Sequence, residues 1–195
     1  PTPPPPPPTL APSSPPSASK NFFFNDTATT EIYTEDASSA ASDVYKRQEL
    51  DRALLETAEL FEKDASNNGR ISTLKNVSSD VWITMDPGHL HQILWNLLLN
   101  AAEAIDGEGQ IGIDMFPLKN RQACVKITDN GCGISQEALK SIFDPFVTTK
   151  PNGTGLGLSI VHRILEAYDA WLNVESELNT GTTVTLHFKQ IVLPA

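Results

Sequence analysis

The sequence predicts an α/β (α+β) sandwich, in which a mixed, mostly antiparallel sheet carries its helices on one face. Three observations predict it. Residues 86–105 place apolar side chains at helical period over almost six turns. Residues 110–116 and 122–128 alternate or run apolar, which is typical of two strands of a hairpin. Residues 171–177 and 182–190 repeat that arrangement around a glycine turn, and helices packed on such hairpins form two layers.

The remaining elements follow from the same patterns. Apolar residues at helical spacing predict a helix over residues 50–65 and another over 158–168. Short apolar segments at 70–74 and 80–85 read as strands separated by an Asn/Ser turn. Ser135 is a suitable N-cap for a short helix through residue 142. We expect Phe143 and Phe146, just beyond it, to pack locally as anchors.

Length and composition exclude several classes of protein. The 195 residues are enough for one ordinary domain with a sizeable core. A formal net charge of −10 disfavours non-specific nucleic-acid binding. The chain has no apolar run near the ~18 residues of a membrane span, so we expect no membrane contact. The two cysteines, Cys124 and Cys132, show no metal or disulfide spacing, which fits a reducing cytoplasm.

The first 48 residues differ in kind from the rest. Ten of the fifteen prolines fall in the first sixteen residues, so residues 1–20 are predicted to form an extended, disordered tail. Asn25–Thr34 resembles the translation of a common sequencing-library adapter, and Ser38–Gln48 resembles that of a transposase-tagging primer. We therefore expect residues 21–48 to be a disordered assembly artefact joined to a truncated gene near Glu49. A genuine disordered linker is the alternative.

Two glycine clusters indicate a nucleotide pocket. The first, Asp129-Asn-Gly-Cys-Gly-Ile134, follows an apolar strand, so its carboxylate lies at a strand end before backbone that can approach a ligand closely. The second, Gly153-Thr-Gly-Leu-Gly-Leu158, opens a helix, and a helix N-terminus offers free N–H groups to phosphate. Neither cluster has the context of a Rossmann motif or a P-loop.

The helix predicted over residues 86–105 carries a third candidate group. Asn96, Asn100 and Glu103 lie three or four residues apart and form one polar stripe beside the apolar face. The simple interpretation is that the amides bond to neighbouring backbone. The alternative is that an asparagine oxygen binds Mg²⁺, a hard cation that takes oxygen ligands and substrate phosphates.

Together these segments resemble one family. Asn96…Asn100, Asp129-x-Gly-x-Gly133, Phe143…Phe146, Gly153-x-Gly-x-Gly157 and Gly181-Thr-Thr183 occur in the order of the N, G1, F, G2 and G3 boxes. These boxes mark the catalytic ATP-binding domain of sensor histidine kinases, within a superfamily that includes gyrase, mismatch-repair ATPases and a heat-shock chaperone. The resemblance covers roughly Glu49 to the C-terminus, is closest to the nitrogen-regulation-like branch, and implies the Bergerat-type ATP-binding fold.

The resemblance also implies a site for ATP and Mg²⁺. Asp129 would accept a hydrogen bond from the adenine amine, Asn100 would bind the metal, and Asn96 and Lys150 would act on the phosphates as catalytic residues. The implied nucleotide-binding residues are Asn96, Asn100, Asp129, Gly131, Gly133, Ile134, Phe143, Gly153, Thr154, Gly155, Leu156, Gly157, Leu158 and Thr183.

The implied parent protein is a two-component kinase. Residues 49–66 would link from a missing histidine-containing dimerisation domain, and residues 67–195 would form the catalytic domain. The parent would be a homodimer, soluble or membrane-anchored, with this domain in the cytoplasm and a response regulator receiver domain as partner. None of the four histidines has a phosphoacceptor context. A hydrolysing superfamily ATPase and a non-catalytic, nucleotide-dependent interaction module remain the alternatives.

Overall fold

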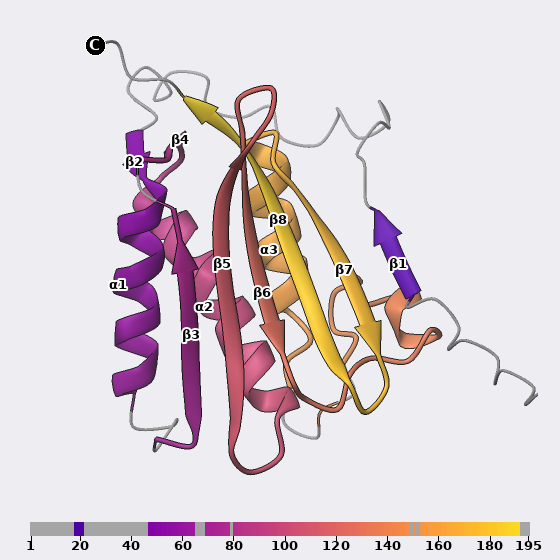
Figure 1. Cartoon of the computed structure of the whole chain (residues 1–195). Helices are drawn as coiled ribbons and strands as arrows, with labels where there is room; N and C mark the ends of the chain where they lie inside the picture. The colour runs from indigo at the N-terminus through magenta and orange to yellow at the C-terminus, as the bar shows by residue number, and fades with distance from the viewer. Residues whose placement is uncertain are drawn as a thin grey trace, which may run out of the picture.

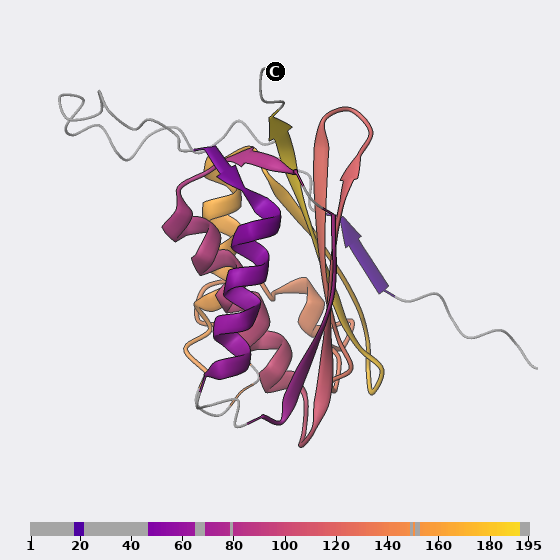
Figure 2. The ribbon, with the colours of Figure 1, turned by 60° about the vertical axis from the view of Figure 1, so that its left-hand side comes forward.

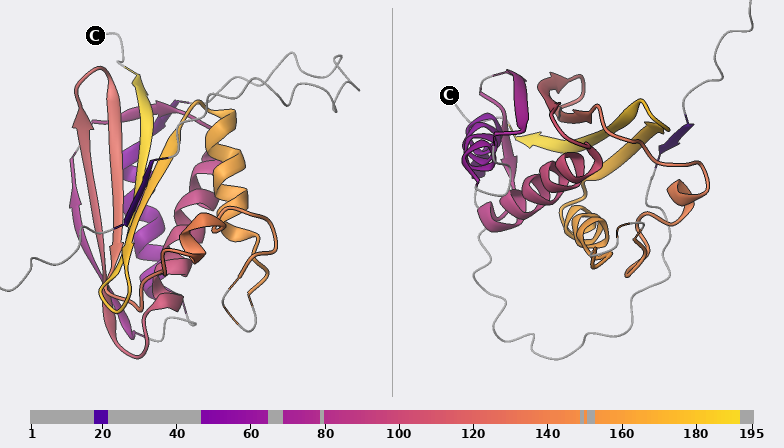
Figure 3. Two further views of the ribbon diagram at one scale, coloured as in Figure 1. Left: turned by 90° about the vertical axis from the view of Figure 1, so that its right-hand side faces the viewer. Right: turned by 90° about the horizontal axis from the view of Figure 1, so that it is seen from below.

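Three helices cover one face of a single sheet (Figures 1 and 2). The computed structural model describes residues 18–21, 47–64, 69–78, 80–148, 150 and 153–191. The helices are α1 (Leu50–Lys63), α2 (Pro87–Ala104) and α3 (Gly157–Ala167). In Figure 3, α2 lies between the other two. The two-layer sandwich predicted from the sequence is confirmed.

The sheet is mostly antiparallel and contains both predicted hairpins. Its strands are β1 (Ala18–Asn21), β2 (Arg47–Glu49), β3 (Ile71–Val77), β4 (Trp82–Thr84), β5 (Gly109–Leu118), β6 (Gln122–Asp129), β7 (Trp171–Glu177) and β8 (Gly181–Ile191). The order is β1-β7-β8-β6-β5-β3, and β4 pairs with both β2 and β8. Only the β3–β5 pair is parallel among the described strands. The β5–β6 and β7–β8 pairs are the two hairpins.

The strands predicted at 70–74 and 80–85 are present as β3, which pairs with β5, and β4, which pairs with β2 and β8. One local prediction differs from the structure. The helix predicted over 135–142 is only a 3-10 turn, Ala138–Lys140, although Ser135 Oγ does accept the Ala138 N–H at 3.2 Å. The Lys140 and Ser141 N–H groups bond to carbonyls three residues back, at Glu137 and Ala138, which is the 3-10 pattern.

The core lies between the helices and the inner face of the sheet. Helix α2 buries one complete face, and every second residue of β6 faces it. The buried core residues of these two elements are Leu90, Ile93, Leu94, Leu97, Leu98, Ala101, Ala102, Ala123, Val125 and Ile127. Because burial of each large side chain contributes about 1.5–3 kcal/mol, this face holds α2 at one rotation about its axis.

Helix α1 belongs to this core. Leu54, Ala58 and Phe61 are buried, and the Phe61 ring meets Trp95 of α2 edge to face with centroids 5.8 Å apart. The helix expected to link from a dimerisation domain thus packs on the core of this domain. A single amphipathic helix has the same pattern whether it packs inside its own domain or against another one.

Two short strands lie in the part of the chain that was expected to lack structure. β1 pairs with the outer edge of β7, and β2 pairs with β4. Directly after β2, the Leu50 N–H donates to the Val81 carbonyl at 2.8 Å. Arg47 and Gln48 thus contribute to the sheet, since pairing at an edge uses backbone groups that any extended chain offers. The other predictions for residues 1–48 lie outside the described residues.

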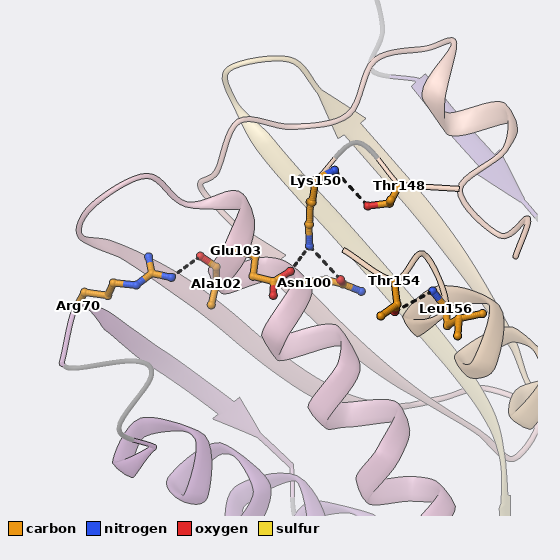
Figure 4. Close-up of polar contacts among 8 residues, drawn as sticks. All are labelled: Arg70, Asn100, Ala102, Glu103, Thr148, Lys150, Thr154 and Leu156. Carbon is orange, nitrogen blue, oxygen red and sulfur yellow. Dashed lines mark hydrogen bonds and ion pairs between the residues drawn. The ribbon is translucent and has the colours of Figure 1, made fainter. Parts of the chain in front are cut away.

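Both ends of α2 are capped by side chains. Asp86 Oδ1 accepts the N–H groups of Gly88 and His89 at 2.8 and 3.3 Å. At the other end Arg70 donates to the carbonyl of Ala102 at 2.9 Å, and to those of Ile105 and Gly107 (Figure 4). A cation at a helix C-terminus also interacts favourably with the helix dipole. These caps fix the length of the helix that carries the polar stripe.

We predict that β2 stabilises the domain although its first two residues match the adapter translation. A chain that begins at Lys46 keeps β2, and one that begins at Leu50 lacks it. Each backbone hydrogen bond lost contributes about 0.5–1.5 kcal/mol net, so the chain from Leu50 should melt a few degrees lower. The chain from Lys46 already lacks β1, so the comparison between the chains from Lys46 and Leu50 isolates the contribution of β2. Calorimetry of the two proteins decides this, and identical melting of both would contradict it.

Candidate functional site

The polar stripe of α2 faces the start of α3. The Asn96 amide donates to the Gln92 carbonyl at 2.8 Å, and its oxygen is turned toward Gly157, where a Cβ would lie 3.2 Å away. The Asn100 nitrogen is 3.8 Å from that same Cβ position. Asn100 Nδ2 is buried and has no hydrogen-bond partner among the described residues. An unpaired buried donor beside a helix N-terminus is available to a ligand oxygen.

The N-terminus of α3 is open. Its N-cap residue is Leu156, whose side chain cannot accept a hydrogen bond, in contrast to Asp86 at the start of α2. The Leu156 N–H itself is directed to Thr154 Oγ1 at 3.4 Å (Figure 4). First-turn N–H groups and the positive end of the helix dipole suit an anion. This is the arrangement expected from the second glycine cluster.

The turn before α3 contacts the Phe146 segment. Gly155 has φ +68°, its carbonyl accepts the Phe146 N–H at 3.0 Å, and an added Cβ would overlap the Phe146 backbone. Phe143 is half-buried, packs on the core and lies against the His162 ring, as predicted. The prediction that Phe146 packs locally is wrong, because 76 % of this residue is exposed. Its φ of +66° turns it outward from the turn.

Asp129 closes the end of β6 with a buried carboxylate. The residue is 8 % exposed, and its Oδ1 accepts the N–H groups of Gly131 at 2.9 Å and Thr182 at 3.3 Å. Both of these bonds end on Oδ1, which leaves Oδ2 as the oxygen for a base. Burial raises the pKa of Asp129, while the two backbone bonds and the charge of Lys150 lower it by less.

Thr183 lies on the face of the sheet opposite to Asp129. It is paired with Thr128, and the two hydroxyls are 3.1 Å apart. Asp129 pairs with Thr182, so these two side chains lie on the same, inner face of the sheet. Successive residues of a strand point to opposite faces, so Thr183 points to the outer face. Thr182, and not Thr183, therefore shares a face of the sheet with Asp129.

Ser176 and Thr182 were not predicted, and they organise the Asp129 corner. Their hydroxyls are 2.9 Å apart, and Ser176 Oγ donates to the Gly181 carbonyl at 3.0 Å. Ser176 Oγ also accepts the Ile134 N–H at 2.8 Å, which fixes the end of the first glycine cluster. The signal in the sequence was a serine and a threonine at inward positions of apolar strands, but their partners depend on strand register.

The glycines of the first cluster are required by packing. A Cβ on Gly131 would overlap the Ala104 carbonyl at the end of α2, to which Cys132 also donates at 2.9 Å. Gly133 has φ +69°, and its Cβ would overlap the Glu177 carbonyl. These glycines were predicted to let a ligand approach. In the structure, the backbone of Ala104 and of Glu177 occupies the space that a Cβ on Gly131 or Gly133 would take.

Lys150 reaches across the stripe of α2. Its Nζ donates to Asn100 Oδ1 at 3.2 Å and forms an ion pair with Glu103 (Figure 4). Its own N–H is held by Thr148 Oγ1 at 3.1 Å, and its carbonyl accepts the Gly153 N–H at 3.2 Å. Lys150 was predicted to act on phosphate, and the structure brings it to Asn100, the predicted metal ligand, and to Glu103 of the same polar stripe.

Residues 85–191 match the model of the histidine kinase-, DNA gyrase B-, and HSP90-like ATPase family. The chain belongs to this family. The match spans α2, both glycine clusters and the strands around Asp129.

Relatives of this ATPase domain are sensor kinases. It is 38 % identical to the signal transduction histidine-protein kinase AtoS of Escherichia coli over 135 residues, which are 69 % of this chain and 22 % of AtoS. It is 39 % identical to the sensor kinase ZraS of the same species over 142 residues, 71 % of this chain and 30 % of ZraS. The chain thus spans less than a third of the length of these relatives.

Solved structures have the same fold. The catalytic domain of histidine kinase ThkA, in a nucleotide-free form, superposes with a TM-score of 0.67 at 29 % identity, covering 74 % of this chain and 95 % of that one. Full-length ShkA, crystallised with AMPPNP, gives a TM-score of 0.67 at 29 % identity over 77 % of this chain and 32 % of ShkA. The Bergerat fold expected from the sequence is confirmed.

The side chains of the ATPase domain suit a nucleotide with a hard cation. Asn100 Oδ1 already accepts from an ammonium, so its oxygen is directed at a cation position. Within the described part of the chain, no cluster of three His, Cys, Asp or Glu could hold a metal without help from a ligand. None of the described helices is long and apolar enough to cross a membrane.

Each histidine has a contact of its own. His89 Nδ1 lies 2.8 Å from the Tyr168 hydroxyl, and His91 Nδ1 lies 3.3 Å from that of Thr57. His162 pairs with Glu166 on α3. His187 stacks on Trp171, and burial lowers its pKa.

We predict that Asp129→Asn makes the stability of the domain less dependent on pH. The asparagine keeps Oδ1 for both backbone N–H groups but cannot ionise. In the wild type, burial raises the folded-state pKa of Asp129 above its ordinary value of about 3.9, so folding favours the protonated carboxyl. That stabilisation is present below about pH 4 and is lost as pH rises through the raised pKa.

The measurement is a set of thermal melts of both proteins without nucleotide, from acid to neutral pH. The melting temperature of the wild type should fall relative to that of the variant as pH rises. Asp106→Asn, at an exposed position, is the matched control and should track the wild type. A constant difference between wild type and Asp129→Asn at every pH would contradict the prediction.

Proposed function

We propose that this chain is the ATP-binding catalytic part of a two-component sensor histidine kinase. It would transfer the γ-phosphate of ATP to a histidine on a dimerisation domain of its parent protein. One observation carries the proposal: a buried carboxylate, an asparagine pair and an uncapped helix N-terminus gather at the same end of α2. Gly131, two residues after Asp129, contacts Ala104, one turn beyond Asn100, and Asn96 faces the start of α3.

Each group has a role that its surroundings support. Asp129 Oδ2 would accept a hydrogen bond from the adenine amine, with Oδ1 held by backbone. The first-turn N–H groups of α3 would bind phosphate oxygens. Asn100 would hold Mg²⁺ through Oδ1. The metal, when bound, would neutralise negative charge on the phosphates. Asn96 and Lys150 would orient and neutralise the transferred group, because phosphoryl transfer is mainly positioning and charge stabilisation.

Hydrolysis is the weaker candidate. A hydrolysing enzyme needs a base to activate water, and Asn96 is an amide whose nitrogen already donates to the Gln92 carbonyl. The carboxylate of Glu103 is engaged by Lys150. A domain that only positions ATP needs neither group as a base, and the named relatives are kinases.

The partners follow from the relatives. AtoS and ZraS are a signal transduction and a sensor histidine kinase, each more than three times as long as the matched segment. We therefore propose a histidine-containing dimerisation domain in a homodimeric parent, a response regulator receiver domain downstream, and a cytoplasmic location for this domain.

We predict that Asn100→Ala and Asp129→Asn fail differently in nucleotide binding. Asn100→Ala removes the metal ligand, so ATP affinity in Mg²⁺ should fall while affinity in EDTA survives. Asp129→Asn places an amide nitrogen against the adenine amine, so affinities for ATP and ADP should fall alike, by roughly ten- to a hundredfold. The measurement is titration calorimetry with and without Mg²⁺. If Asn100→Ala weakens binding equally in both buffers, the metal assignment is wrong.

We predict that the chain alone forms no acid-labile phosphohistidine with labelled ATP and Mg²⁺. Its four histidines are held in structural contacts, and the acceptor helix is absent from the sequence. A histidine-containing dimerisation domain of a sensor kinase, added in trans, should become labelled, and Asn100→Ala should abolish that labelling. Strong self-labelling of His89, His91, His162 or His187 would overturn this prediction. Steady release of free phosphate without any labelled protein would favour the hydrolytic alternative.

A further inference from the structure

The strongest unassigned feature is the cation bound to Asn100 in the nucleotide-free domain. That cation is the ammonium of Lys150, which lies 3.2 Å from Asn100 Oδ1 and is ion-paired with Glu103. Figure 4 shows the ammonium directed between these two side chains of α2. Glu103 follows Asn100 by three residues, so both project from the same face of the helix.

We propose that Lys150 occupies the metal position of Asn100 until nucleotide arrives, and that Glu103 is the positioning residue that holds it there. This inference rests on the proposed function, since it takes the Asn100 oxygen as the metal ligand. Lys150 is thus an internal substitute for the divalent cation. Binding of a metal–nucleotide complex would exchange the ammonium from Asn100 to the phosphates.

Lys150 and a divalent cation cannot both bind the Asn100 oxygen at the same time. An ammonium and a divalent cation both seek amide and carboxylate oxygens, and Oδ1 is the only oxygen that the Asn100 side chain has. The amide nitrogen faces the start of α3, so Oδ1 is directed to Lys150. Two cations within a few ångströms repel each other, which disfavours binding of a metal while Lys150 is present.

The contact is also suited to exchange. The side chains of Lys150 and Glu103 are 36 % and 43 % exposed, and ion pairs this open to water add little net stability. Lys150 is attached near its backbone by Thr148 Oγ1, so its flexible side chain can reorient while its backbone stays in place. Asn100 Nδ2, which has no partner among the described residues, lies on the side of α3 to which phosphate would come.

The proposal is tested with Mn²⁺ as the probe and without nucleotide. Mn²⁺ is titrated into the full chain and followed by electron paramagnetic resonance of the free ion. Lys150→Met should bind Mn²⁺ about tenfold or more tightly than the wild type, since a positive charge beside the site is removed. The gain should vanish in Lys150→Met/Asn100→Ala, which lacks the proposed metal ligand. Lys119→Met, in the exposed β5–β6 turn, is the matched control and should bind like the wild type.

Two results would overturn the proposal. One is equal Mn²⁺ affinity of wild type and Lys150→Met. The other is a gain in Lys150→Met that persists when Asn100 is replaced. A thermal melt of each protein verifies that it is folded, as expected for changes at these exposed or half-exposed side chains.

A second measurement separates this proposal from the proposed function. In Glu103→Gln, Lys150 is no longer held, so affinity for metal-free ATP should rise and the ratio of affinities with and without Mg²⁺ should fall several-fold. An unchanged ratio would contradict the role of Glu103. The Mn²⁺ titration contains no nucleotide, so a chain that binds no ATP would refute the proposed function alone, and equal Mn²⁺ affinities would refute this inference alone.

Discussion

The rotation of helix α2 about its axis is the constraint on which the rest of the structure depends. Its buried leucines, isoleucines and alanines pack against the inner face of the sheet and leave only one direction for the opposite stripe. That stripe carries Asn96, Asn100 and Glu103 toward α3 and Lys150. The same helix ends against Gly131, so its length, set by the caps from Asp86 and Arg70, also fixes the distance to Asp129. Packing energy on one face thereby positions chemistry on the other.

The Asp129 corner shows how a buried charge can be kept without a salt bridge. Two backbone N–H groups satisfy Oδ1, and the hydroxyls of Ser176 and Thr182 connect the neighbouring turn to the end of the glycine cluster. A buried polar group without such partners would be strongly destabilising, so the corner is held together as a unit. Both backbone hydrogen bonds end on Oδ1, so they do not occupy Oδ2.

The contrast between the two helix N-termini separates structure from function. Helix α2 begins with an aspartate that accepts two of its own N–H groups. Helix α3 begins after a leucine, with a glycine in its first turn and the Asn96 oxygen close by. An uncapped helix end costs stability unless a ligand or water satisfies it. The family to which the chain belongs supplies the class of ligand, and the cation already at Asn100 shows that the site accepts positive charge.

The sequence by itself determined the features that depend on local periodicity: the α2 helix and its polar stripe, the two hairpins, Asp129 at a strand end and the glycine-opened α3. These follow from residues close together in the chain. Only the tertiary structure decided that Thr182 and not Thr183 shares a face with Asp129, because this depends on the β6–β8 register. It also decided that backbone of other segments packs against Gly131 and Gly133, and that α1 packs on the core of the domain. The contact of Lys150 with Asn100 and Glu103 was likewise decided by the tertiary structure. Each of these joins segments far apart in the chain, and no periodic pattern records which distant atoms will meet.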